Sequence, residues 1–182
     1  MPKLLVLFQS RSHDVVHLAE TVAAGARSVR FAEVDLRRFP ITDDANDVTV
    51  DTSGRAHRLI EHADEIEAYD GLILAVASAS DGDSLLRAIG AFSGSLENKV
   101  GAALTSATGT DRRIVLWSVL GPMADRGMIL LSAPFADERS SDDDATRRLG
   151  KRVADVVGWV THARSHHHHE HHPHDHQPHH HH

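Results

Sequence analysis

Five short apolar runs recur along the chain, and amphipathic patterns with helical spacing separate them. The apolar runs cover residues 3–8, 30–36, 71–77, 100–106 and 128–132. The third and fourth runs are almost wholly apolar, which is typical of strands buried on both faces of a sheet. Strands that alternate with helices predict an α/β fold, in which helices cover both faces of a parallel sheet.

The segments between these runs predict five helices. The first begins after residue 13, and its apolar residues repeat at helical spacing: Val15, Leu18, Val22 and Ala26. Three more are predicted over 56–69, 83–92 and 111–126, and Pro122 should kink or shorten the last of these. The final helix has the clearest start, because Ser141 can cap it and three aspartates, 142–144, suit the positive end of its dipole. Its predicted buried stripe is Ala145, Leu149, Val153, Val156 and Val160.

Five parallel strands with helices on both faces predict a three-layer sandwich with strand order 2-1-3-4-5. Ligands of such sheets bind at the carboxyl ends of the strands, where the order reverses. Strands 1, 3 and 4 therefore direct three loops, 10–14, 78–83 and 106–111, to one place. These loops are rich in hydroxyls and small residues, which also form ordinary turns. Their convergence at one edge favours a ligand site over turn formation alone.

The first loop leads directly from a buried strand into a helix, and this arrangement holds phosphate groups in many α/β proteins. Its candidate phosphate ligands are Ser10, Arg11, Ser12 and His13, with the helix start at Asp14 and Val15. The loop has no glycine, so its backbone has fewer ways to wrap an anion. Ser78, Ala79 and Ser80 are the candidates in the second loop. The candidates in the third loop are Ala107, Thr108, Gly109, Thr110 and Asp111.

Composition narrows the class of protein. The formal charge is −7, of which Glu170 and Asp175 near the carboxyl end supply −2, so the remainder carries −5. This charge argues against binding to nucleic acid or to an anionic membrane surface. The absence of cysteine excludes disulfides, thiolate catalysis and cysteine-based metal sites. No apolar run is long enough to span a membrane and no signal-peptide pattern is present, so a cytoplasmic protein is expected.

The carboxyl-terminal segment differs from the rest of the chain. Residues 1–164 predict one folded domain, and 12 of the 18 residues 165–182 are His, which predicts a disordered tail. Interspersed acidic residues and prolines favour a native segment over a purification tag. Neutral imidazoles at this density bind Ni²⁺, Zn²⁺, Cu²⁺ or Co²⁺. The candidate metal ligands are His166, His167, His168, His169, His171, His172, His174, His176, His179, His180, His181 and His182.

Several motifs together resemble the flavodoxin-like NAD(P)H:quinone oxidoreductases of the WrbA type, within the NADPH-dependent FMN reductase superfamily. The matching segments are 3–10, 69–74, 105–110, 127–128, 141–145 and 149–154, and the Thr108-Gly109-Thr110 loop and the last helix are the most specific. The resemblance implies a flavodoxin-like fold, non-covalent FMN and electron transfer from NAD(P)H to a small quinone-type acceptor. It also implies a homo-oligomer, either a dimer or a tetramer.

The chain departs from the family pattern at its loops. Members usually have glycine where His13 stands and threonine where His17 stands, and their second loop usually reads Pro-Thr-Arg-Phe-Gly where this chain has 77–81. Two hypotheses therefore follow. One is an FMN-dependent oxidoreductase with altered flavin loops, and the other is a non-catalytic flavodoxin-like scaffold whose His-rich tail binds transition metals.

Other conspicuous residues have simpler interpretations. His13 and His17 lie one helical turn apart and could share a metal, although a surface or interface role is favoured for His17. His57 and His62 are expected on the solvated face of a charged helix. The two tryptophans, Trp117 and Trp159, are expected to pack in the core or an interface rather than against a flavin.

Overall fold

The computed structural model describes residues 1–9, 12–39, 57–90, 94–132 and 142–167. Five parallel strands form one sheet in the order β2-β1-β3-β4-β5, as the sequence predicts. The strands are β1 (Lys3–Gln9), β2 (Glu33–Arg38), β3 (Gly71–Val76), β4 (Val100–Thr105) and β5 (Ile129–Leu131). The helices are α1 (His13–Arg27), η1 (Ala63–Ala68, a 3₁₀ helix), α2 (Ala79–Gly90), α3 (Gly109–Asp125) and α4 (Asp142–His167).

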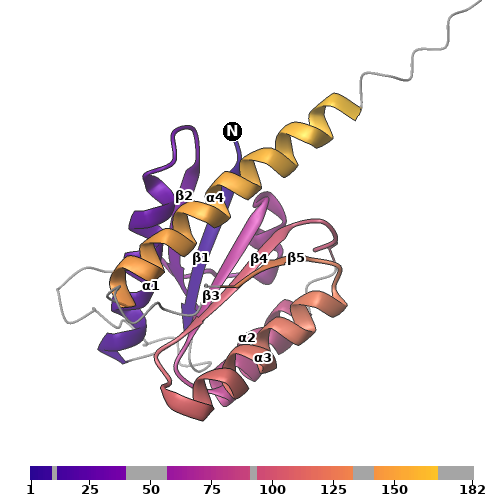
Figure 1. Ribbon diagram of the computed structural model, residues 1–182. Coiled ribbons are helices and arrows are strands. Elements are labelled where there is room, and N and C mark those ends of the chain that lie inside the picture. Colours follow the sequence, from indigo (N-terminus) through magenta and orange to yellow (C-terminus); the bar gives the residue numbers. More distant parts are fainter. Residues whose placement is uncertain (10–11, 40–56, 91–93, 133–141, 168–182) are drawn as a thin grey trace, which may run out of the picture.

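The helices cover the sheet in two layers, with α1 and α4 on one face and α2 and α3 on the other (Figure 1). Successive residues of a strand point to opposite faces, so β1 serves both layers. Leu4 and Val6 pack toward α1 and α4, whereas Leu5 and Leu7 pack toward α2 and α3. The wholly buried β3 and β4 confirm the expectation from their nearly continuous apolar runs.

Helices α1 and α4 pack so closely that two glycines are needed at their contact. A Cβ on Gly25 would lie 2.1 Å from the carbonyl oxygen of Arg147, and a Cβ on Gly150 would lie 2.0 Å from that of Val22. Both distances are far below an ordinary contact, so a larger residue would push the helices apart. In the predicted stripe of α4, Ala145, Leu149 and Val153 are buried, and Val156 and Val160 are partly buried against the same core.

Three expected elements differ from the structure. Residues 57–62 are not helical, because Leu59 pairs with Arg38 as a parallel bridge and extends the sheet edge at β2. Of the helix predicted over 56–69, only η1 is helical among the described residues 57–69. Strand β2 begins at Glu33 instead of Arg30, because Phe31 takes a positive φ of 72° in the preceding turn. Pro122 does not shorten α3, since it lies in the last turn and the helix continues to Asp125.

Two helix ends also differ from the predictions. Helix α2 begins at Ala79, four residues before its predicted start. Helix α4 continues to His167, so 165–167 of the predicted tail are helical, whereas 168–182 and the predicted cap Ser141 lie outside the described residues. Within the part of the chain that the structure describes, no helix has the length and apolar character needed to cross a membrane.

Candidate functional site

The three predicted loops meet at the carboxyl edge of the sheet. Gln9 at the end of β1 is paired with Val76 at the end of β3, and Val76 is paired with Thr105 at the end of β4. Helices α1, α2 and α3 begin within four residues of these strand ends. Three helix amino termini, each the positive end of a helix dipole, therefore face the same edge (Figure 1).

The first loop enters α1 through Ser12, whose side chain does not cap the helix. Of the candidate phosphate ligands here, His13 and Asp14 are exposed, Val15 is buried in the core, and Ser10 and Arg11 lie outside the described residues. The ring of His13 stacks on His17, with 6.4 Å between centroids. His17 Nε2 in turn lies 3.0 Å from a carboxylate oxygen of Asp143 at the start of α4. The first loop is thus linked to α4 through this histidine pair.

The second loop closes upon itself. Ser78 is the residue before α2, and its Oγ accepts a hydrogen bond of 3.3 Å from the backbone N–H of Asp81. The carboxylate of Asp81 accepts a hydrogen bond of 3.2 Å from the backbone N–H of Ser78. This reciprocal pair is a capping box, which satisfies two backbone donors at the start of the helix. The hydroxyls of Ser78 and Ser80 are also 2.8 Å apart, so both interact within the loop.

The third loop, in contrast to the second, has no capping box at the start of its helix. Thr108 precedes α3 without a side-chain cap, and Gly109 has a φ of +60°, a conformation that favours glycine. A Cβ placed on Gly109 would have no neighbour within 4 Å. The loop is fixed at its base, where the backbone N–H of Ala107 donates to Thr105 Oγ1 at 3.1 Å. The remaining candidates here, from Thr108 to Asp111, are exposed.

These features fit a phosphate-bearing ligand such as FMN at the first and third loops. The starts of α1 and α3 lack a side-chain cap, and backbone N–H groups at such starts bind anions. The open backbone at Gly109 leaves room for a ligand to approach. The second loop fits less well, because the Ser78 hydroxyl and the Asp81 carboxylate already accept hydrogen bonds from backbone N–H groups at the start of its helix.

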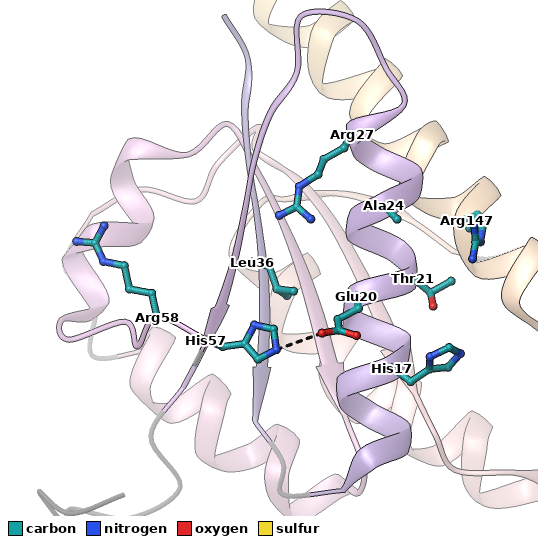
Figure 2. A pocket seen from close by; sticks show the side chains of 9 residues that line it. All are labelled: His17, Glu20, Thr21, Ala24, Arg27, Leu36, His57, Arg58 and Arg147. Carbon is teal, nitrogen blue, oxygen red and sulfur yellow. Dashed lines mark ion pairs between the residues drawn. The ribbon is translucent and has the colours of Figure 1, made fainter. Parts of the chain in front are cut away.

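A separate pocket of about 520 Å³ lies along α1 and contains none of the candidate loop residues. Figure 2 shows His57 pointing toward Glu20, with which it forms an ion pair of 3.4 Å. The three arginines of the pocket do not converge, because Arg58 and Arg147 lie on opposite sides of α1 (Figure 2). The pocket therefore offers no concentrated site for an anion.

His57 and His62 each make contacts within the folded chain. His57 does not lie on a solvated helix face, as its sequence context predicted, because its ring packs edge-on against Phe8 at 5.2 Å. His62 precedes η1 and takes part in a capping box with Glu65. Among the residues that the structure describes, no three His, Asp or Glu side chains are grouped to hold a metal ion.

A polar cluster at the outer side of β2 was not predicted. Tyr69 donates a hydrogen bond of 2.5 Å to Asp35, and the buried Arg37 forms an ion pair with Glu65 of η1. Burial and the bond to Asp35 raise the pKa of Tyr69 to about 12. Burial alone would raise the pKa of Glu65, but backbone N–H donors at Glu61 and His62 and the Arg37 guanidinium lower it. The cluster joins η1 to β2 of the sheet.

The two tryptophans are exposed, so of the predicted alternatives, core or interface packing, the core alternative is wrong for both and the interface alternative stays a prediction. Trp117 on α3 is 66% exposed and Trp159 on α4 is 70% exposed. The apolar residues near each tryptophan in the sequence are buried in the core. Each tryptophan itself lies on the side of its helix that faces away from the core.

Comparison with known proteins shows clear relatives by sequence. The chain is 31% identical over 152 residues to an NAD(P)H dehydrogenase (quinone) of Acidovorax ebreus, covering 75% of this chain and 72% of that protein. It is 27% identical over 179 residues to an NAD(P)H dehydrogenase (quinone) of Syntrophobacter fumaroxidans, covering 90% and 87%. No family model matches the chain.

Solved structures agree on the fold at lower identity. A flavodoxin, WrbA-like protein from Agrobacterium tumefaciens superposes with a TM-score of 0.52 at 18% identity, covering 88% of this chain and 99% of that one. A flavodoxin of Streptococcus pneumoniae superposes with a TM-score of 0.58 at 15% identity, covering 86% and 98%. These likenesses confirm the predicted flavodoxin-like fold.

Proposed function

Since the chain belongs to the NAD(P)H dehydrogenase (quinone) family, we propose that it is an FMN-dependent oxidoreductase that transfers electrons from NAD(P)H to quinone-type acceptors. The observation that carries this proposal is the meeting of three loops at the carboxyl edge, where α1 and α3 begin without side-chain caps. A bound flavin would supply the hydride and electron chemistry, and the protein would bind and orient it.

The first loop would hold the FMN phosphate. Ser10, Ser12 and the start of α1 would donate hydrogen bonds, and Arg11 would supply the opposite charge. Arg11 would matter more here than in a glycine-rich loop, because fewer backbone donors can surround the phosphate. Asp14 and Asp111 increase this need for a cation, since both are exposed at the same edge.

The third loop would receive the rest of the cofactor. Thr108 and Thr110 carry exposed hydroxyls that suit the ribityl chain, and Gly109 allows its backbone to come close to a ligand. The second loop would contribute mainly by shape, since Ser78 already bonds to Asp81 within the capping box. The two small residues beside it, Ala77 and Ala79, are partly buried against the core, so they would offer the flavin ring no aromatic contact.

The test is a fluorescence titration of the purified full chain with FMN, together with the flavin absorbance of the protein as isolated. We expect saturable quenching of FMN fluorescence and flavin-dependent oxidation of NADH or NADPH by a benzoquinone. An absence of FMN binding at concentrations up to about 100 µM, which means a binding free energy weaker than about −5.5 kcal/mol, would contradict the proposal.

A second candidate function is metal binding by the tail, on a scaffold that need not bind flavin. The observation that favours it is the density of imidazoles after residue 165. Helix α4 itself extends past the end of the sheet as far as His167 (Figure 1). Its ligands are local in sequence and require no preformed cavity. Binding should weaken as the pH falls through about 6.5, where imidazole becomes protonated and no longer coordinates.

Deletion of residues 168–182 tests whether the tail carries the metal site independently of the flavin site. Calorimetric titration with Ni²⁺ and with Zn²⁺ should lose most of its signal in the truncated chain, while FMN affinity and the melting temperature remain nearly unchanged. Full metal affinity after truncation would place the site in the folded domain, where His13 and His17 would be the first residues to replace. A large fall in melting temperature would show that the tail packs on the domain.

A further inference from the structure

A groove lies at the amino edge of the sheet, at the opposite end of the strands from the three loops. It is formed by Pro2, by the turn 29–32 between α1 and β2, and by one side of α4 within 154–165. Its volume is about 470 Å³. Strands β1 and β2 begin beside it, at Lys3 and Glu33. We call it the amino-edge groove.

Two exposed aromatic rings line the groove from different segments of the chain. Phe31 of the turn is 71% exposed, and Trp159 of α4 is 70% exposed. The φ of Phe31 is 72°, a conformation that a bulky residue adopts only at an energetic cost. Beside Trp159, a Cβ placed on Gly158 would have no neighbour within 4 Å, so the backbone of α4 is open there. The groove is therefore suited to a segment that stacks on aromatic rings.

The groove also carries a positive charge that the folded domain does not neutralise. Arg30 is exposed, and within the described part of the chain its side chain forms no ion pair or hydrogen bond. The acidic residue Asp155 in the groove is already paired with Lys151 at 2.8 Å. A segment that fits the groove should therefore combine rings that stack with carboxylates that pair with Arg30.

The segment that follows α4 has this composition. Helix α4 ends at His167, and residues 168–182 follow it. They contain ten histidines, two prolines and the carboxylates Glu170 and Asp175, with no Lys or Arg. Imidazole rings stack on aromatic side chains, and proline-containing segments bind aromatic-lined grooves in several recognition domains.

The segment is also long enough to reach the groove. Ser165 lines the groove, and the segment begins three residues later. At 1.5 Å per residue, Trp159 lies about 12 Å back along α4 from His167. Six extended residues span about 20 Å, so Pro173 can return to Trp159. The residues after Pro173 can then run toward the turn that carries Arg30.

We propose that residues 168–182 fold back and occupy the amino-edge groove, with their rings and prolines on Phe31 and Trp159 and their carboxylates paired with Arg30. Tethering makes weak contacts sufficient, because a short linker gives an effective concentration on the order of 1 mM. A contact with a dissociation constant of about 1 mM would then be formed in about half of the molecules. This occupancy raises the melting temperature by only about 1–2 °C.

The tether favours this segment over a separate molecule as the occupant. A partner present at about 1 µM would need contacts roughly a thousandfold tighter to reach the same occupancy. The open, mostly exposed rings of the groove suit many weak contacts better than a few strong ones.

The two tryptophans of the chain allow a test with an internal control. Trp117→Phe leaves Trp159 as the single tryptophan, and Trp159→Phe leaves Trp117, which is 66% exposed on α3. Acrylamide quenching is compared between the full chain and a chain that ends at His167, with EDTA present to remove metal ions. Deletion should raise the quenching constant of Trp159 about 1.5- to 2-fold, because about half of the molecules lose their protection. The constant of Trp117 should not change.

A charge variant tests the contact with Arg30. In the full chain with Trp159 as the single tryptophan, Arg30→Glu should weaken docking at least about tenfold, since a carboxylate then faces the acidic residues of the segment. The quenching constant of Trp159 should rise to that of the truncated chain. The matched control is Arg113→Glu, because Arg113 is also exposed but lies on α3 in the other helix layer. This control should keep Trp159 protected.

The segment can also be supplied as a separate molecule. A synthetic peptide of residues 168–182, added to the truncated chain, should restore the protection of Trp159 with a dissociation constant of about 1 mM. A peptide with Glu170→Gln and Asp175→Asn should bind several-fold more weakly, because neutral amides do not pair with a guanidinium as carboxylates do.

Three results would overturn the proposal. One is equal quenching of Trp159 in the full and truncated chains, whether the ring is then open to solvent or covered by another molecule. Another is an equal change at Trp117, which would show that the segment alters fluorescence without occupying the groove. The last is full protection of Trp159 in Arg30→Glu. None of the measurements contains FMN or a metal ion, so the proposed functions are tested separately.

Discussion

The starts of α2 and α3 are neighbours at the same sheet edge, but side chains cap the backbone N–H groups of α2 and do not cap those of α3. Helix α2 is capped by Ser78 and Asp81 of its own loop, at 3.3 and 3.2 Å. Helix α3 begins after Thr108 without a side-chain cap and contains Gly109 in a left-handed conformation. One loop stabilises its own helix, and the other leaves its backbone open.

The difference predicts that the loops of the site have separate roles in ligand binding and in stability. A capped helix start is rigid and stable, but its donors are already satisfied. An uncapped start is less stable on its own and can gain hydrogen bonds from an anionic ligand. We therefore expect changes in the first and third loops to alter FMN affinity, and changes in the second loop to alter stability.

The largest expected effect is that of Arg11→Ala in the first loop. A charge-assisted contact to the FMN phosphate contributes about 1.5–3 kcal/mol, so its loss should weaken FMN binding at least about tenfold. Fluorescence titration measures the change. The control is Arg87→Ala on α2, which removes an exposed arginine from the helix of the closed loop and should leave the affinity unchanged. Equal affinity of wild type and Arg11→Ala would refute the role of Arg11.

The next effect is that of replacing Gly109 in the open loop. A side chain in the left-handed conformation costs about 1–2 kcal/mol, so the free loop of Gly109→Val should leave this conformation. Binding would have to restore it, which should weaken FMN binding about 5- to 30-fold. Gly109→Asn should lose less, because asparagine tolerates this conformation. The same titration compares the two variants. If valine and asparagine had the same effect, backbone conformation at residue 109 would not be what the ligand requires.

A smaller effect is expected from opening the closed loop. Ser78→Ala removes the cap of α2 and should lower the free energy of unfolding by about 1 kcal/mol. For a chain of this size the melting temperature should fall by roughly 2–4 °C, as calorimetry would show. FMN affinity should change by less than about twofold if the Ser78 hydroxyl serves only the helix. A tenfold loss of affinity in this variant would show that the second loop binds the cofactor directly.

The smallest effect is expected from His13→Gly. His13 crowds the approach of a phosphate to the start of α1, so its removal should tighten FMN binding by less than about tenfold. The stacking contact with His17 is lost in the same variant. His17→Ala is the control, because it removes the contact without opening the loop. If His17→Ala also bound FMN more tightly, loss of the stacking contact would explain the gain in affinity. If His13→Gly bound FMN more weakly, His13 would be shown to contact the cofactor.

The sequence predicted the sheet well, because each strand has a local signal that burial explains. Runs such as 71–77 and 100–106 are apolar throughout, and the structure buries both faces of β3 and β4. The same reasoning failed over 56–69. Apolar residues there fit a helical period, but Leu59 and Ile60 are held by pairing with Arg38, a partner remote in sequence.

The sequence contains a capping-box pattern at the start of α2, which the prediction of a ligand role for the second loop did not take into account. Ser78 and Asp81 are three residues apart just before an apolar helix, which is the spacing of a capping box. Other contacts had no such signal. His17 and Asp143 lie 126 residues apart in the sequence, and the buried Arg37 is paired with Glu65 of η1, 28 residues away. Only the folded chain brings these groups together.

The sequence by itself determined the alternation of strands and helices, the order of the sheet and the three loops at one edge, because periodicity and the rules of parallel connections act locally. The tertiary structure decided which loop side chains remain open to a ligand and which apolar residues remain exposed. Ser78 is used within its own loop, and Trp117 faces outward while Val115 and Val119 face the core. Such choices depend on which groups meet in space, and spacing along the chain does not contain that information.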